Sequence, residues 1–475
     1  MLLLKAFDLM SAFVATPTRV MLCGPCDAAL LAQVHAQAPD LQLTMLRDRA
    51  DGVPPGATWV DKSSLSGVDD LSLTPAQEDF HEQVMRRLMA DSRSYFLLER
   101  IMTSVAYGTV FNGLTRVDQY VRRSIKLLDE HNPQRVIFMS TPHDILWFFA
   151  QTAEARGCEI LVLKPGPMPD QIFVTRGLDA QTVLETGAGD ATKARAQAQA
   201  FIALRQRSYA EAGAASSQGH RQRYGNKSFN LRTELRRALT AGSPREVVRK
   251  LTLLPPKRHL ARTYEGLAVT QLDPAQQGRS VVLFLHYQPE RSSLPEGGDY
   301  AQQLRVARTL AAALPDGWEL LIKEHPDYYR LTFKPRVRDA EVYHAMARLP
   351  NTRLVGLGMD TFSLIDHAAA VVTLTGTVGI EGFTRGKPAL VFGCACYQDA
   401  PGVTRVASLA QTRAALKAIA QGAKPDPQAV EDWLTWTALH AAPEHTGDPI
   451  VRRKAIIAAL GAQQGPRPPL EGHRS

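Results

Sequence analysis

Two short segments in the last third of the chain combine side chains and turns that suit an anionic ligand. Lys323 to Pro326 reads KEHP and follows the apolar run WELLI, while Thr373 to Gly382 reads TLTGTVGIEG and follows AAAVV. The first offers a cation and an imidazole. The second offers hydroxyls and a glycine turn that opens a helix, where free backbone N–H groups attract anions. Because ligands of open parallel sheets bind beyond the carboxyl ends of the strands, the spacing predicts one phosphate site at one sheet edge.

The same rule selects individual candidate residues. A lysine and a histidine can neutralise a phosphate, the proline ends the strand, and the two threonines can donate hydroxyls beside a glycine that permits close approach. Glu381, about one turn inside the following helix, is placed to accept from a ribose hydroxyl. The predicted nucleotide- and phosphate-binding residues are Lys323, His325, Pro326, Thr375, Gly376, Thr377 and Glu381. An ordinary glycine turn between a strand and a helix is the alternative interpretation.

These segments lie in a stretch of alternating strand and helix patterns. Five apolar, β-rich runs alternate with helical patterns between residues 279 and 393, which predicts a doubly wound parallel sheet. Earlier, the β-branched run at Arg135 to Asp144, a helix ending at Gly157 and a further strand predict a βαβ unit. At 475 residues the chain is too long for one ordinary core. We therefore predict an α/β fold with two Rossmann-like lobes.

The predicted boundaries follow changes in composition and pattern. Residues 1–190 form the N-terminal Rossmann-like lobe, and residues 276–425 form the C-terminal lobe. Residues 191–275 are predicted to be a basic helical connecting region. Residues 426–475 are predicted to contain a helix that packs back on the first lobe and a disordered tail, because the end of the chain is rich in Gln, Gly and Pro.

The bulk properties favour a soluble globular protein. The chain is 45% hydrophobic and 21% charged, and no apolar run reaches the ~20 residues that span a bilayer. The apolar start is interrupted by Lys5 and Asp8 and has no basic stretch ahead of it, so we expect no secretory signal and a cytoplasmic location. Five cysteines are too few for a disulfide scaffold. Cys23 and Cys26 form CGPC, which resembles a thioredoxin pair, although a strand-to-helix turn is the favoured interpretation.

Positive charge is concentrated in one stretch. From His220 to Arg262, twelve Lys and Arg residues face only Glu234 and Glu246, a net charge of +10 against +8 for the whole chain. Such a stretch can bind nucleic acid, anionic lipid or an acidic glycan, and a solvated helical surface is the alternative. No nucleic-acid module accompanies it, so we expect no nucleic-acid partner and favour lipid or an anionic polymer.

Four segments together resemble the bacterial capsule polysaccharide biosynthesis protein family, which includes retaining β-Kdo transferases. They are FMSTPHD, HYQPERSSLPEGG, LLIKEHPDYY and DTFSLIDHAAAVVTLTGTVGIEGFTRGKPALVFG. The resemblance implies a GT-B fold with two Rossmann-like lobes facing a cleft, the nucleotide on the C-terminal lobe and the acceptor on the other. It also implies that the His-Pro pair and the Thr-Gly-Thr turn bind the nucleotide phosphate. Kdo enzymes carry an acidic residue a few positions after the glutamine that follows the first strand of the C-terminal lobe. Here that glutamine is Gln288, and Glu290 and Ser292 stand two and four positions after it.

Glycosyl transfer requires a stabilised leaving phosphate and a base for the acceptor hydroxyl. No Asp-x-Asp run follows a predicted strand and no Cys/His cluster has zinc spacing, so we expect no metal and no cofactor. We predict Glu290 as the catalytic carboxylate, with His143 and Asp144 as the alternative base; a helix N-cap is the other interpretation of Asp144. Gln288 and Asp299 are predicted at the periphery of the donor site.

The sequence and the resemblance together predict a metal-independent glycosyltransferase of capsule or other cell-surface polysaccharide synthesis. The expected donor is a nucleotide sugar, by resemblance CMP-linked and carrying Kdo, and the expected acceptor is a glycan or glycolipid. We further expect peripheral association with the anionic inner membrane or with capsule-assembly proteins. Two alternatives stay open: a sugar-nucleotide epimerase of the same architecture, and a non-catalytic glycan-binding or assembly subunit of capsule export.

Overall fold

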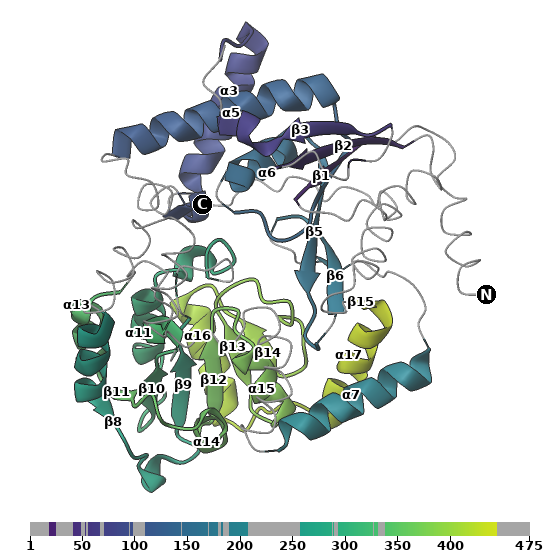
Figure 1. Ribbon diagram of the computed structural model, residues 1–475. Helices are drawn as coiled ribbons and strands as arrows, with labels where there is room; N and C mark the ends of the chain where they lie inside the picture. The colour runs from purple at the N-terminus through teal and green to yellow at the C-terminus, as the bar shows by residue number, and fades with distance from the viewer. Residues whose placement is uncertain are drawn as a thin grey trace, which may run out of the picture.

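The computed structural model describes the greater part of the chain (Figure 1). The described residues are 19–24, 41–48, 53, 56–66, 71–94, 96–97, 110–143, 145–169, 171–178, 182–183, 190–207, 257–286, 288, 293–325, 327–330 and 338–443. Of the basic stretch between residues 220 and 262, only 257–262 belong to this set, so the expectation of a lipid or polymer surface there falls outside it. Within the described residues, every helix is too short or too polar to cross a lipid bilayer.

The first lobe is built on a mixed sheet in the order β15-β6-β5-β4-β1-β2-β3, with β7 paired to β6. The strands from β5 to β3 run parallel, and β6 is antiparallel to each of its partners β5, β7 and β15. Their bounds are β1 (Arg19–Cys23), β2 (Gln42–Arg47), β3 (Thr58–Asp61), β4 (Arg135–Phe138), β5 (Glu159–Pro165), β6 (Gln171–Arg176), β7 (Thr182–Val183) and β15 (Ala442–Pro443). Helices η1 (Lys62–Ser66), α3 (Pro75–Ala90), α5 (Val110–His131) and α6 (Ile145–Ala155) complete the lobe.

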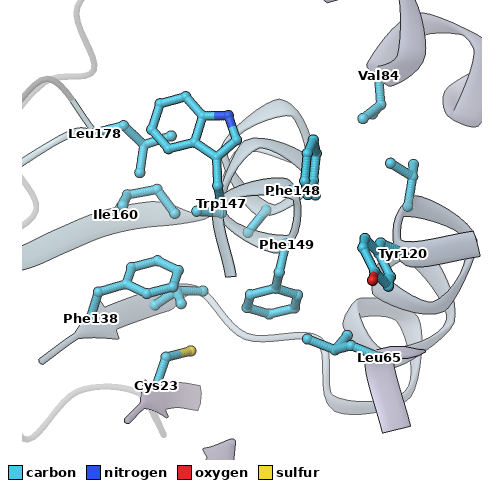
Figure 2. Close-up of a cluster of buried hydrophobic side chains, with 14 of the residues drawn as sticks. Cys23, Leu65, Val84, Tyr120, Phe138, Trp147, Phe148, Phe149, Ile160 and Leu178 are labelled. Carbon is cyan, nitrogen blue, oxygen red and sulfur yellow. The ribbon is translucent and has the colours of Figure 1, made fainter. Parts of the chain in front are cut away.

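The core of the first lobe lies around α6. This helix is apolar on almost all sides, and its residues Trp147 to Ala153 are buried, because it lies between the sheet and α5. Figure 2 shows Trp147, Phe148 and Phe149 packed between strand residues such as Phe138 and the α5 residue Tyr120. The ring of Phe149 meets that of Phe138 edge-on, with centroids 6.4 Å apart.

The second lobe is built on an all-parallel sheet in the order β14-β13-β12-β9-β10-β11-β8. Its central strands are buried on both faces and read as continuous apolar runs, as expected when helices cover both sides. The strands are β8 (Ala268–Val269), β9 (Ser280–Phe284), β10 (Glu319–Lys323), β11 (Thr352–Val355), β12 (Ala370–Thr373), β13 (Ala389–Val391) and β14 (Val403–Arg405). The helices are η2 (Pro274–Gln276), η3 (Gly298–Tyr300), α11 (Gln303–Ala311), α12 (Asp327–Arg330), α13 (Ala340–Ala347), α14 (Thr361–His367), α15 (Val378–Thr384) and α16 (Leu409–Ala420).

Two further helices join the lobes. Helix α7 (Ala191–Arg205) packs along α17 (Pro427–His440), side by side in Figure 1, and both contact α15. After α17 the chain returns to the first lobe, where β15 pairs with β6. The core of the second lobe begins before residue 276, because β8 pairs with β11 and Tyr264 is fully buried among its core residues. The predicted α/β class with two Rossmann-like lobes is confirmed.

We predict that Trp147→Ala lowers the free energy of unfolding of the first lobe by about 3–5 kcal/mol, because it leaves a large cavity in a fully buried position. Urea unfolding monitored by circular dichroism measures this loss. Trp59→Ala is the matched control, since Trp59 is 38% exposed on the edge strand β3, and a change within about 0.5 kcal/mol is expected there. Equal effects of the two substitutions would contradict the described core.

Candidate functional site

The carboxyl edge of the second sheet contains a topological switch point. The chain passes from β9 to β10 and β11 on one side, and then returns to β12 on the other side of β9. In open parallel sheets, such a reversal leaves a crevice beyond the carboxyl ends of the two strands that flank it. The loops after β9, β10 and β12 meet at this edge, so the predicted KEHP and TLTGTVGIEG segments lie on one side of one sheet.

A buried histidine holds the turn that follows β12. Nε2 of His286 lies 3.1 Å from Oγ1 of Thr373 and accepts a 3.3 Å hydrogen bond from the backbone N–H of Thr375. The N–H of Gly376 donates to Oγ1 of Thr373 at 3.2 Å. A Cβ at position 376 would stand 2.8 Å from that oxygen, closer than real Cβ atoms come, so the turn requires glycine. Here the glycine allows the backbone to pack against Thr373, and the close approach to a ligand that the sequence suggested stays a prediction.

The opposite side of the turn packs against the loop after β13. The hydroxyl of Tyr397 donates to the carbonyl of Gly376, and its ring occupies the space that a Cβ at Gly379 would need. Thr375 is half-buried and Thr377 is exposed, at the N-cap of α15, where its side chain makes no capping hydrogen bond. The turn is thus fixed from two sides, and it presents Thr377 to solvent.

Glu381 faces helix α7 in this structure. Its carboxylate is buried, and Oε1 lies 3.4 Å from Nη1 of Arg205. Burial raises the pKa of Glu381, whereas Arg205 and Arg385 act in the opposite direction. The ion pair joins α15 to α7, so the ribose contact expected for Glu381 stays a prediction.

Lys323 braces two neighbouring loops. It ends β10, is 4% exposed, and its Nζ donates to the carbonyls of Gly356 at 2.9 Å and Leu357 at 2.8 Å, just beyond β11. Burial lowers the pKa of Lys323 to about 8, against the opposing charges of Glu265 and Asp360. Lys323 therefore lies at the expected edge of the sheet, and its ammonium group donates hydrogen bonds to backbone carbonyls of the protein. His325, two residues later, is half-buried at the same edge.

A buried ion pair that sequence reasoning missed fixes the KEHP segment. Glu324 is fully buried and forms a two-pronged contact with Arg338, from Nε to Oε2 and from Nη2 to Oε1, both at 2.9 Å. Tyr343 donates its hydroxyl to Oε2 at 2.5 Å, and the backbone N–H of His325 donates to Oε1 at 2.7 Å. The sequence did contain one signal for this ion pair. Glu324 directly follows a buried strand, and a carboxylate that is buried requires a partner.

The same arginine connects the end of β10 to the end of β9. Nη2 of Arg338 donates to the carbonyl of His286, and Nη1 donates to Oε1 of Gln288 at 3.3 Å. Gln303 completes the link, since it accepts from the N–H of His286 at 2.7 Å and donates to Oε1 of Gln288 at 2.8 Å. Gln288 in turn donates to the carbonyl of Ala301 at 2.7 Å. Gln288 therefore acts in the structure as part of the scaffold under the site.

The first lobe meets the second through residues at or just after the carboxyl ends of its own strands. Thr141, after β4, donates its hydroxyl to Glu296 of the second lobe. Lys164 of β5 is 4% exposed, donates to the carbonyl of Cys394 at 3.2 Å, and lies 3.6 Å from Oε1 of Glu296. Figure 1 shows β5 reaching toward the second lobe. The carboxyl edges of the two sheets thus face each other, and Lys164 and Glu296 were not foreseen from the sequence.

The remaining predicted residues divide into two groups. His143 is half-buried next to this contact, with Nδ1 3.4 Å from the carbonyl of Thr141, and Asp299 is exposed and accepts from the hydroxyl of Ser92 in the first lobe. The others, Asp144, Glu290 and Pro326, lie outside the described residues.

No group of three or more metal-ligating side chains comes together in the part of the chain that the structure describes. The expectation of metal-independent chemistry stays a prediction.

We predict that Glu324→Ala lowers the free energy of unfolding of the second lobe by about 3–5 kcal/mol, because it leaves the guanidinium of Arg338 buried without its carboxylate. Chemical denaturation measures the loss. Glu341→Ala, which removes an exposed carboxylate from α13, is the matched control and is expected to change stability by no more than about 0.5 kcal/mol. A loss below about 1 kcal/mol for Glu324→Ala would contradict the role assigned to the pair.

The lowered pKa of Lys323 predicts a pH dependence of stability. Between pH 8 and its ordinary pKa of 10.5, the unfolded chain binds the lysine proton more fully than the folded protein does. The free energy of unfolding of the wild type, relative to that of Lys323→Met, is therefore expected to rise with pH across this window. Parallel curves for the two proteins between pH 8 and 10.5 would show that Lys323 titrates normally.

Comparison with known proteins finds one family that the second lobe resembles. Residues 265–429 match the model of the family described as capsule polysaccharide biosynthesis protein. No curated protein matches the chain. Among solved structures, the β-Kdo 2,7 transferase KpsC of Thermosulfurimonas dismutans is 12% identical to this chain. The match covers 71% of this chain and 88% of the KpsC chain, with a TM-score of 0.31. The UDP-GlcNAc 2-epimerase of Methanocaldococcus jannaschii is 8% identical. That match covers 87% of this chain and 98% of the epimerase chain, with a TM-score of 0.26.

The family match covers every element that forms the candidate site on the second lobe. It begins within the helix that carries Tyr264 and ends at the start of α17. The TM-scores of both solved structures lie below 0.5, so the likeness to the capsule polysaccharide biosynthesis protein family depends on the match over residues 265–429. Over residues 265–429 the chain matches the model of the capsule polysaccharide biosynthesis protein family, and the resemblance expected from its motifs is confirmed over that span.

Proposed function

We propose that the protein is a metal-independent glycosyltransferase that moves a sugar from a nucleotide donor to a glycan or glycolipid acceptor in capsule or other cell-surface polysaccharide synthesis. One observation carries the proposal. The turn clamped by His286 after β12 and the segment that presents His325 after β10 converge at the switch point of the second sheet, inside the matched family region.

The donor phosphate is assigned to this edge. Its developing negative charge needs fixed donors, and a rigid site provides them without reorganisation during the reaction. We assign the phosphate contacts to the imidazole of His325, the hydroxyl of Thr377 and the backbone around Gly376. Lys323 acts differently from the sequence-based expectation, because its ammonium holds the loop after β11 and adds positive potential without direct contact.

The acceptor is assigned to the first lobe, whose strand ends face this edge through the Thr141–Glu296 and Lys164–Glu296 contacts. The general base is assigned to Glu290, with the pair His143 and Asp144 as the alternative on the acceptor side. A CMP-linked donor carrying Kdo is the specific form of the proposal that the family resemblance favours. The proposed location is the cytoplasm, with peripheral contact to the anionic inner membrane or to capsule-assembly proteins.

We predict that His325→Ala weakens nucleotide binding about 10- to 100-fold, as expected for the loss of a hydrogen bond to a charged group. Isothermal titration calorimetry with CMP, UDP and GDP measures the change. His344→Ala, which removes an exposed imidazole from α13, is the control and should bind like the wild type. Unchanged affinity in His325→Ala, or no nucleotide binding by the wild type, would contradict the assigned phosphate site.

We predict that Glu290→Gln keeps nucleotide binding and loses turnover about 10²- to 10⁴-fold, because the amide cannot accept the acceptor proton. The assay follows nucleotide release from a panel of CMP-, UDP- and GDP-sugars with and without acceptor glycans. If Glu290→Gln turns over normally while His143→Ala does not, the base belongs to the first lobe. Conversion of a UDP-sugar to its epimer without release of nucleotide would instead identify the epimerase alternative.

A further inference from the structure

Buried groups make the contact between the two lobes. Lys164, near the carboxyl end of β5, is 4% exposed, and its ammonium contacts two groups of the second lobe, the carbonyl of Cys394 at 3.2 Å and Oε1 of Glu296 at 3.6 Å. The same oxygen of Glu296 accepts from the hydroxyl of Thr141 in the first lobe. A buried cation is stable only with such partners. We call Thr141, Lys164 and Glu296 the interlobe junction.

Apolar side chains flank the interlobe junction, and each lobe contributes to a buried cluster of the other. Leu294 of the second lobe belongs to the core cluster of the first lobe around α6. In the opposite direction, Met168, in the loop after β5, belongs to a buried cluster with Ala395 and Tyr397 of the second lobe. Burial of these side chains lowers the local dielectric constant, which strengthens the attraction between the charges beside them. The junction is therefore a fixed contact rather than a solvated pair of surface charges.

The loop after β13, residues 393–397, connects the interlobe junction to the second sheet. The carbonyl of Cys394 accepts from Lys164, and the backbone N–H of Cys394 donates to the carbonyl of Glu296 at 2.8 Å. The N–H of Gly393 donates to the carbonyl of Leu374, just after β12, at 3.0 Å. A displacement of Lys164 would therefore move a loop that is hydrogen-bonded to the end of β12.

The same loop touches the turn to which the donor phosphate is assigned. Gly393 lies between the carbonyl of Glu296 and the methyl of Thr375, since a Cβ at this position would stand 2.5 and 2.7 Å from them. Tyr397, at the end of the loop, donates its hydroxyl to the carbonyl of Gly376. Close-packed groups transmit displacements, because a protein interior contains few gaps that could absorb them. The position of the first lobe is therefore coupled to that of the phosphate turn.

We propose that Lys164 and Glu296 are positioning residues for glycosyl transfer, whose ion pair sets the distance between the first lobe and the turn after β12. The inference rests on the proposed function, in which the acceptor binds the first lobe and the donor binds the second. Transfer requires both substrates to be held at reacting distance, and a misplacement of about 1 Å can lower the rate about 100-fold. Neither side chain needs to contact a substrate to have this effect.

The first experiment measures the interlobe junction in the nucleotide-free protein by hydrogen–deuterium exchange and mass spectrometry. Lys164→Met and Glu296→Gln are each expected to raise amide exchange about fivefold or more in residues 139–143 and 293–301, whereas β9 and β10 keep their wild-type exchange. The double variant is expected to exchange no faster than the faster single variant, because the two charges act as one unit. Lys417→Met and Glu341→Gln, the same changes at exposed positions of α16 and α13, are the matched controls.

The second experiment separates positioning from binding, with the donor and acceptor that give turnover in the nucleotide-release assay. Lys164→Met is expected to lower kcat about 10- to 100-fold and to leave the nucleotide Kd within about twofold, because the proposed nucleotide contacts all lie in the second lobe. Lys164→Arg keeps the positive charge and is expected to recover most of the lost kcat. Thermal unfolding checks that each variant is folded. Thr141→Val, expected to raise the same exchange about two- to tenfold, replaces a charge variant that unfolds.

Four results would overturn the proposal. They are wild-type exchange in the junction variants, equal effects in the two controls, raised exchange with unchanged kcat, and a loss of nucleotide affinity that accounts for the loss of turnover. The two proposals fail in distinguishable ways. A wild type without nucleotide binding or turnover contradicts the proposed function, whereas the exchange results of the junction variants do not depend on nucleotide.

Discussion

The buried ion pair between Glu324 and Arg338 is the interaction on which the candidate site depends. It joins the carboxyl end of β10 to that of β9, because the guanidinium holds the Glu324 carboxylate on one side and the His286 carbonyl on the other. His286 then holds the turn after β12 through Nε2. Three strand ends that come from distant parts of the sequence are therefore fixed relative to one another. A charge buried in this way is costly alone and specific when paired, which makes it a means of positioning.

This connection divides the roles within the KEHP segment. Lys323 holds the neighbouring loop, Glu324 anchors the segment from below, and His325 remains partly exposed at the edge. Two charged residues thus support one candidate contact residue. A similar division holds after β12, where Thr373 and Gly376 shape the turn and Thr377 is exposed. Preorganised donors of this kind suit a reaction in which charge develops on a leaving phosphate.

Much of the fold could be predicted from the sequence because buried parallel strands appear as continuous apolar runs, and their alternation with helices fixes the sheet type. The placement of the KEHP and TLTGTVGIEG segments at one edge of one sheet also followed from the sequence, through the rule for strand ends. The partners within it could not be predicted: Arg338 lies fourteen residues from Glu324, and Glu296 lies far along the chain from Lys164, with no periodic pattern linking either pair. The protein partners of Lys323 could not be predicted for a related reason, since its 4% exposure results from the loop after β11, which the local sequence does not reveal. Residue type suggested the candidate site, and tertiary contacts show which partners each of its described residues has.

The most direct test of the central claim is a crystal structure of the protein grown with CMP and, separately, with UDP. The account predicts the nucleotide phosphate at the carboxyl edge of the second sheet, within hydrogen-bonding distance of the His325 imidazole and of the turn at Gly376. A nucleotide bound in the first lobe, or at the amino edge of either sheet, would contradict it.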